Sequence, residues 1–284
     1  MKIIFFLFIR PLSYLPFSVL YFFSDLLYLV VYHLIGYRKK VVYQNLRNAF
    51  PEKPAGDINK IAKGFYRHLC DLIIEAIKLF HISESALIDR CRLINPALMN
   101  NYAAQGKGLV LVAGHYSNWE MAGIACDLQI PHQVVCIYTP LKNKFFNEQI
   151  RTSRSRFGME LCPKLKVKKK FEENHHKLTA FIFAADQSPT SARSAYWTRF
   201  LNQETGVMVG AEKYAKKYDQ PVLFGKVSKI KRGYYTIEFI PLEDHPKDTS
   251  FGAISEKHTR LLEAIIEEQP ELWLWSHRRW KKKR

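Results

Sequence analysis

Leu109-Val-Leu-Val-Ala-Gly-His115-Tyr-Ser-Asn-Trp-Glu120 is the stretch that decides how this chain folds. Its first five residues, 109–113, are apolar and predict a short buried strand that ends at a glycine. A helical spacing of apolar residues begins after Asn118. His115 is therefore expected in the turn that follows a strand, and Glu120 in the first turn of a helix.

A turn histidine and a first-turn carboxylate can meet and act together. In that arrangement His115 is a general base, and Glu120 fixes the imidazole tautomer and stabilises the imidazolium that forms. The same residues also spell a helix capping box, Ser117-x-x-Glu120, in which the glutamate reaches back to the backbone N–H of Ser117. The two interpretations are compatible, because a glutamate that reaches toward its cap also approaches a histidine two residues before that cap.

The composition predicts a folded protein with anionic partners. The chain has 284 residues, of which 48% are hydrophobic, enough for one large α/β domain or two small ones. Its net charge of +17 points to a phosphorylated lipid, an anionic membrane, an acidic carrier protein or a nucleic acid. Five cysteines without zinc-binding spacing predict reduced core residues. The motifs of nucleotide-dependent enzymes, zinc proteases and serine hydrolases do not occur.

The N-terminal segment is long and apolar enough to reach a membrane. Residues 12–37 carry only Asp25 and His33 as groups that ionise near neutral pH, and about 20 apolar residues suffice to cross a bilayer. A single span within residues 15–35 is predicted, and the alternative is a helix that lies in the membrane interface. The basic run that begins at Arg38 favours a cytoplasmic position for the rest of the chain.

Beyond this segment, apolar strands alternate with helical stretches. Helices are expected over 38–51, 57–80, 117–128, 143–157, 206–218 and 252–268, and strands over 109–113, 133–138, 178–184, 222–227 and 234–240. Such alternation predicts an α/β fold: a single domain with a central mixed, mostly parallel sheet flanked by helices, plus an N-terminal membrane-anchoring helix. No internal repeat or flexible linker indicates a second domain boundary.

Two clusters after the central stretch add candidate site residues. The helix end over 149–158 presents Arg154 and Arg156, although cations at a helix C-terminus also serve simply to stabilise the helix. The strand over 178–184 leads into Asp186, and open α/β sheets place functional groups at such strand ends.

The C-terminal stretch over 270–284 interleaves aromatic and basic residues, among them Arg278 and Arg279. This composition suits either a membrane interface or a surface on which nucleic-acid bases stack.

Together these motifs resemble those of the bacterial lipid A biosynthesis (lauroyl/myristoyl) acyltransferases, a branch of the glycerolipid acyltransferase superfamily. The broader superfamily more often has His-x4-Asp, so Glu120 after His115 favours the lipid A branch. The resemblance extends over most of the chain and assigns residues 1–37 to a membrane anchor and 38–284 to an acyltransferase domain. It also includes Asn45-Leu-Arg-Asn-Ala-Phe-Pro51, Asp186-Gln187 and Trp275-Ser-His-Arg-Arg-Trp-Lys281.

By this resemblance, His115 takes the proton of an acceptor hydroxyl and Glu120 orients it. The hydroxyl oxygen then attacks the thioester carbonyl of an acyl donor directly, without an acyl-enzyme. The resemblance makes Arg154, or else Arg156, the arginine that binds a phosphate or steadies the oxyanion. It gives Asp186 a supporting position near the site. The other residues expected to bind substrate are Asn118, Arg278 and Arg279.

The resemblance further implies an acyl carrier protein or CoA thioester as the donor, an anionic phosphorylated lipid A precursor as the acceptor, no metal or nucleotide cofactor and no nucleic-acid partner. It places the protein at the bacterial inner membrane, with the catalytic domain on the cytoplasmic face. Two alternatives stay open. One is an acyltransferase that acts on a lyso-aminolipid or a lysophospholipid with the same residues, and the other is a membrane-tethered basic binding protein without catalysis.

Overall fold

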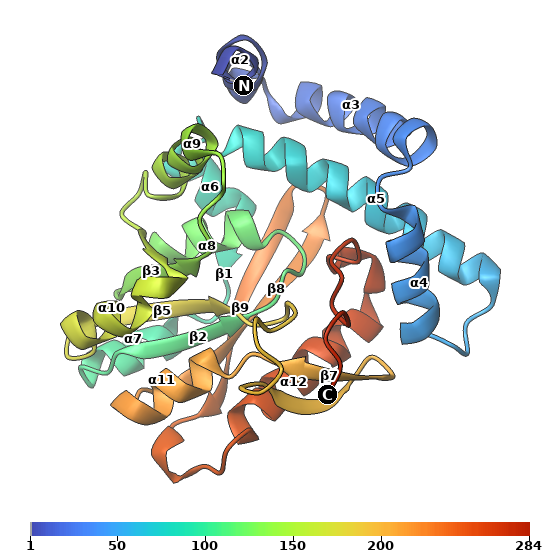
Figure 1. Ribbon diagram of the computed structural model, residues 1–284. Helices are drawn as coiled ribbons and strands as arrows, with labels where there is room; N and C mark the ends of the chain where they lie inside the picture. The colour runs from blue at the N-terminus through green and yellow to red at the C-terminus, as the bar shows by residue number, and fades with distance from the viewer. Residues whose placement is uncertain (1) are drawn as a thin grey trace.

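In the computed structural model, which describes residues 2–284, a seven-stranded sheet forms the centre of the protein (Figure 1). The strand order is β1-β9-β8-β2-β5-β3-β4, and all neighbours are parallel except β8 and β9. The predicted mixed, mostly parallel sheet is thereby confirmed. Its strands are β1 (Cys91–Leu93), β2 (Leu109–Ala113), β3 (Gln133–Tyr138), β4 (Glu160–Pro163), β5 (Thr179–Ala184), β8 (Val222–Lys231) and β9 (Tyr234–Glu243).

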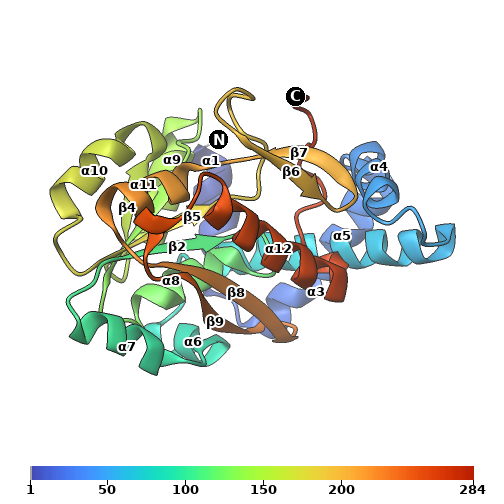
Figure 2. The same cartoon turned by 90° about the horizontal axis from the view of Figure 1, so that it is seen from below.

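Helices cover both faces of the sheet (Figure 2). Alternate residues of β2 point to opposite layers: Leu109 and Leu111 join the core beneath α8, whereas Val110 and Val112 join the core beneath α11 and α12. Burial on both faces explains why β2 is apolar at every position. The principal helices are α4 (Lys39–Ala49), α5 (Ala55–Lys78), α6 (Glu84–Arg90), α7 (Pro96–Ala104), α8 (Trp119–Asp127), α9 (Lys144–Arg154), α10 (Val167–Asn174), α11 (Gly210–Tyr218) and α12 (Ala253–Glu268).

A small antiparallel hairpin, β6 (Tyr196–Phe200) with β7 (Gln203–Val207), was not predicted. It takes the first residues of the helix expected over 206–218, which instead begins at Gly210. Leu201 and Asn202 connect the two strands, and both have positive φ angles, 48° and 62°. A two-residue turn of this kind matches the twist of a hairpin.

The N-terminal segment crosses the top of the molecule in Figure 1 and lies along α5. It consists of α1 (Lys2–Ile4), the π-helical segment Phe5–Ile9, α2 (Arg10–Tyr14) and α3 (Phe17–Tyr28). α3 continues into a second π-helical segment, Leu29–Ile35. Phe17–Ile35 is the one helix within residues 2–284 that is long and apolar enough to cross a membrane. Polar contacts nevertheless tie it to α5, since the Ser24 hydroxyl donates to Asp71 Oδ1 at 2.7 Å.

Candidate active site

The candidate site forms where β2 and β5 end side by side. Ala113, the last residue of β2, pairs in parallel with Ala184, the last residue of β5. Parallel strands deliver the residues that follow them to the same edge of a sheet. His115 and Asp186, each two positions further along, therefore meet there, although 71 positions separate them in the sequence.

Asp186 holds the imidazole of His115 in one orientation. Its Oδ1 atom lies 2.7 Å from His115 Nδ1, and its Oδ2 atom accepts hydrogen bonds of 2.9 Å from the His115 backbone N–H and from Trp273 Nε1. Nδ1 is assigned as the donor from this network, which leaves a lone pair on Nε2. The Gln187 side-chain amide lies 3.2 Å from Nε2 and can donate to it. The arrangement is that of a general base with its orienting carboxylate.

Burial and charge act in opposite directions on this pair. Burial lowers the pKa of His115, but the charge and the hydrogen bond of Asp186, with the charge of Glu120, outweigh it and raise the pKa above its ordinary value. Burial raises the pKa of Asp186, but the contacts with His115 and Trp273 prevail and lower it to about 2. Asp186 is therefore ionised at neutral pH and favours a protonated imidazole.

Glu120, expected to orient His115, is bonded to a different residue. Arg154, at the end of α9, donates through Nε to Glu120 Oε2 at 2.9 Å and through Nη2 to Oε1 at 2.5 Å. Glu120 Oε1 also accepts from the Trp119 indole at 3.2 Å. The structure thus departs from the expectation: the carboxylate that contacts the imidazole of His115 is Asp186, and the charge of Glu120 raises the pKa of His115 without a hydrogen bond between them. The bidentate pair also brings Arg154 into the site.

The capping box Ser117-x-x-Glu120 does not form. Asn118 is the N-cap of α8, and its Oδ1 atom accepts from the Met121 N–H at 2.8 Å. Ser117 has a positive φ of 55° and donates its N–H to the carbonyl of Leu272 at 3.0 Å. The side chain of Asn118 is buried and caps the helix, and its expected substrate role stays a prediction.

A buried glutamate that sequence reasoning missed supports this turn. Glu75 on α5 is fully buried and accepts hydrogen bonds from Asn118 Nδ2 at 2.5 Å and from the hydroxyls of Tyr21 and Tyr235 at 2.7 Å each. Burial raises its pKa. Glu75 therefore joins α3, α5, β9 and the start of α8. No local pattern marks it, because its partners come from three distant segments.

The other predicted arginines have different surroundings. Arg156 donates through Nη1 to the carbonyl of Leu79 at 3.0 Å, so Arg154 is the candidate of the two that contacts Glu120. Arg279 is 2% exposed and donates to Thr205 Oγ1 at 2.7 Å, and its expected role in binding substrate stays a prediction. Arg278 is exposed, and its role stays a prediction.

The aromatic residues near the C-terminus form core, not an interface. Trp273 and Trp275 are 1% and 0% exposed, and the structure packs them against each other at a ring-centroid distance of 4.8 Å. Their indoles donate to Asp186 and to the carbonyl of Pro270. The expectation of a membrane or nucleic-acid surface made by these rings is therefore wrong. Trp273 instead is a site residue that sequence reasoning missed.

An apolar cavity of about 340 Å³ lies beside Glu120 and Arg154, between α5, α8 and α9. Trp119, Glu120 and Arg154 line it where it approaches His115, whose ring centroid is 5.2 Å from that of Trp119. The rest of its wall is almost entirely aliphatic or aromatic. Leu72 and Ala76 on α5 and Ile150 on α9 belong to this wall.

Residues 2–284 hold no group of three or more His, Cys, Asp and Glu side chains arranged to bind a metal ion.

Comparison with known proteins then identifies the family of the chain. No curated protein matches it significantly. The sequence profile of the bacterial lipid A biosynthesis acyltransferases matches residues 2–282, nearly the whole chain. The chain therefore belongs to the bacterial lipid A biosynthesis acyltransferase family and is an acyltransferase.

Proposed function

We propose that this enzyme moves a fatty acyl chain from an acyl carrier protein thioester, or from acyl-CoA, to a hydroxyl of a lipid A precursor. The observation that carries the proposal is the position of His115. Its Nδ1 is held by Asp186, its Nε2 has a lone pair, and its ring lies beside Trp119, which lines a mostly apolar cavity suited to a hydrocarbon chain. A base beside an acyl site is the minimum that transfer to a hydroxyl requires.

The reaction begins at Nε2 of His115. The acceptor hydroxyl replaces the Gln187 amide at this atom and gives its proton to the imidazole, while its oxygen bonds to the thioester carbonyl carbon. The tetrahedral intermediate collapses with cleavage of the carbon–sulfur bond. The leaving thiolate takes the proton from the imidazolium, so the products are an ester and a free thiol. Asp186 stabilises the imidazolium throughout these steps.

Arg154 supplies positive charge at the same place. Glu120 occupies its Nε and Nη2, and within residues 2–284 no protein group accepts from Nη1. That N–H group is available to the tetrahedral oxyanion or to a phosphate of a substrate. Glu120 thus has two roles in this proposal: it fixes the guanidinium, and its charge favours the protonated form of His115.

The apolar cavity binds the acyl chain of the donor. Its wall comes from α5, α8 and α9, and Ala76 is the smallest side chain among the aliphatic ones. Burying each methylene contributes about 0.8 kcal/mol, so the length of this cavity sets the preferred chain. The net charge of +17 suits an acidic carrier protein, a phosphorylated acceptor and an anionic membrane surface on the cytoplasmic face.

Mass spectrometry of lipid A and of the polar lipids tests this proposal. It compares a deletion strain with the same strain complemented by the wild-type gene, by His115→Ala or by a control, His176→Ala. His176 is an exposed histidine outside the site. We expect one secondary acyl chain to be absent from lipid A with no gene or with His115→Ala, and present with the control. If an aminolipid or a phospholipid loses an acyl group instead, that lipid is the acceptor and the assignment to a lipid A precursor is wrong. No lipid change in any strain would refute the transferase proposal.

A further inference from the structure

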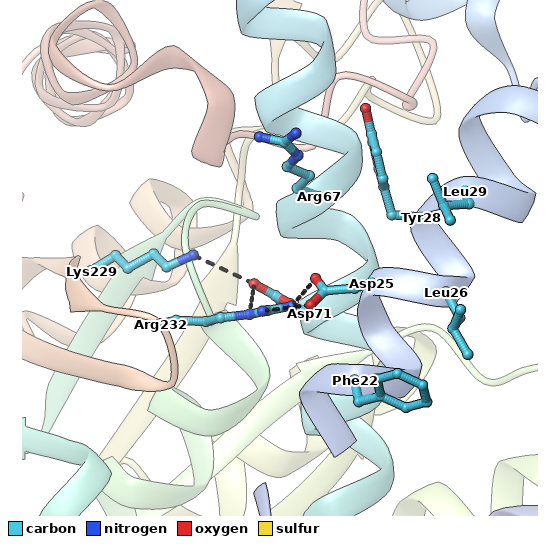
Figure 3. A pocket seen from close by; sticks show the side chains of 9 residues that line it. All are labelled: Phe22, Asp25, Leu26, Tyr28, Leu29, Arg67, Asp71, Lys229 and Arg232. Atoms are coloured by element: carbon cyan, nitrogen blue, oxygen red, sulfur yellow. Dashed lines mark hydrogen bonds and ion pairs between the residues drawn. The ribbon is translucent and has the colours of Figure 1, made fainter. Parts of the chain in front are cut away.

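A second cavity, of about 620 Å³, lies between α3, α5 and the turn from β8 to β9 (Figure 3). None of its lining residues lines the apolar cavity beside Glu120. On α5, Arg67 and Asp71 face the second cavity, whereas Leu69 and Ile73 face the first. Residues two apart on a helix point about 200° from each other. The two cavities therefore lie on opposite faces of α5, and the second is separate from the candidate active site.

Ion pairs fix part of this cavity. The guanidinium of Arg232 donates through Nε and Nη2 to Asp71 and through both Nη atoms to Asp25 (Figure 3). The Asp71 side chain is only 5% exposed and also accepts from Ser24 on α3. Because Asp71 and Asp25 both bind Arg232, these three residues connect α3, α5 and the turn between β8 and β9.

Two further cations, Lys229 and Arg67, line the cavity, and neither has a hydrogen-bonded protein partner within residues 2–284. Lys229 Nζ is 3.8 Å from Asp71 Oδ2, and within residues 2–284 it makes no hydrogen bond, although its side chain is only 18% exposed. Arg67 lies over the ring of Tyr28 at 5.2 Å, with no carboxylate of the described chain within 4 Å. The lining thus holds three cations and two carboxylates, and no protein group of the described chain accepts a hydrogen bond from Lys229 or Arg67.

The wall of the cavity that the N-terminal helix forms carries three apolar side chains besides Asp25 and Tyr28. They are Phe22 and Leu26 on α3 and Leu29 directly after it, and these residues are 61%, 44% and 51% exposed. Exposed apolar residues on a candidate membrane helix face lipid or the membrane interface. A ligand that satisfies both walls has an anionic group next to a hydrocarbon chain.

We propose that this cavity binds one anionic membrane phospholipid. Its phosphate accepts from Lys229 and Arg67, and one acyl chain lies against Phe22, Leu26 and Leu29. The lipid is neither the acyl donor nor the acceptor, because α5 separates the cavity from His115. It fixes the orientation of the enzyme on the membrane by a specific contact in addition to the general attraction of a basic protein to an anionic surface.

Vesicle binding by the purified full-length protein tests this proposal, with phosphatidylglycerol in phosphatidylcholine compared with phosphatidylcholine alone. The site variant is Arg67→Gln/Lys229→Gln. The control is Lys60→Gln/Lys63→Gln, which removes two exposed cations from the same face of α5, four and seven residues before Arg67. We expect the site variant to bind phosphatidylglycerol vesicles roughly tenfold more weakly than the control, because it loses two charge-assisted contacts to one phosphate.

If both double variants lose the same amount of vesicle binding, the proposal is overturned, and general electrostatic attraction alone explains the binding. A calorimetric titration with inorganic phosphate separates the sources of the anion: binding that requires Arg67 and Lys229 and needs no lipid would overturn the phospholipid assignment. Thermal unfolding shows whether a loss of binding comes from misfolding. The single variant Lys229→Gln keeps Arg67, so its vesicle binding should lie between that of the wild type and that of the site variant. Binding is measured without turnover, so this outcome is independent of the proposed reaction.

Discussion

Oδ1 of Asp186 lies 2.7 Å from Nδ1 of His115, and Oδ2 of the same carboxylate accepts from the backbone N–H of that histidine. Both the position and the tautomer of the imidazole thus depend on one aspartate. Glu120, only five positions from His115 in the sequence, is paired with Arg154 instead.

Replacing Asp186 by asparagine should lower kcat by roughly 10²–10⁴-fold, because an amide cannot stabilise the imidazolium and its NH2 group favours the wrong tautomer. A suitable control is Glu212→Gln, another buried carboxylate, which accepts from the backbone of Gly252 and Ser255 away from the site. Steady-state rates of acyl transfer measure the effect. Equal rate losses in both variants would show that Asp186 has no specific role.

The pH dependence of kcat/KM should change in the same variant. His115 must be neutral to accept a proton, and its pKa in the protein is raised, so activity is lost as the pH falls through that raised pKa. Removing the charge of Asp186 lowers the pKa of His115. The acidic limb of the profile should therefore move to lower pH in Asp186→Asn and stay in place in Glu212→Gln.

The pair of Glu120 and Arg154 should show a measurable coupling free energy. The side chains are 27% and 22% exposed and share two hydrogen bonds, so a double-mutant cycle with Gln at both positions should give roughly 1–3 kcal/mol in the free energy of unfolding. The exposed pair of Arg151 and Glu148, at 3.0 Å, is the matched control. It should give less than about 1 kcal/mol. Similar values for both pairs would contradict this prediction.

Enlarging Ala76 should shorten the acyl chain that the enzyme prefers. Ala76→Leu adds three carbon atoms to the wall of the apolar cavity, so the preferred donor should become roughly two to four carbons shorter. Ala103→Leu, on α7 outside that cavity, should leave the preference unchanged. Competition between thioesters of different length, analysed by mass spectrometry, gives the answer. An unchanged preference with a slower rate would place the acyl chain elsewhere.

Glu75→Gln should change how stability depends on pH. The pKa of Glu75 is raised by burial, so the native state binds more protons than the unfolded state and wild-type stability falls as the pH rises above the unfolded value of about 4.5. Glutamine does not titrate and loses that contribution. The free energy of unfolding of Glu75→Gln, relative to wild type, should therefore increase with pH in denaturant titrations. A constant difference would mean that Glu75 keeps an ordinary pKa.

Local sequence determined the elements that build the sheet centre. The predicted strands over 109–113 and 133–138 coincide with β2 and β3. β2 is apolar throughout because it is buried on both faces, whereas β3 begins with the exposed Gln133 and is recognised by its apolar residues from Val134. The position of His115 after a strand followed from the same pattern. The short strands β1 and β4 and the β6–β7 hairpin were missed, since a strand of three to five residues is too short to give a clear periodic signal.

The partners of the site residues were decided by tertiary structure alone. The sequence identified His115, Glu120, Arg154 and Asp186, but the spacing of five favoured the wrong carboxylate for the histidine. Asp186 reaches His115 because β2 and β5 are adjacent and in parallel register, and no local pattern contains that register. A strand or a helix is fixed by neighbouring residues, whereas a hydrogen bond between two side chains depends on where distant strands end.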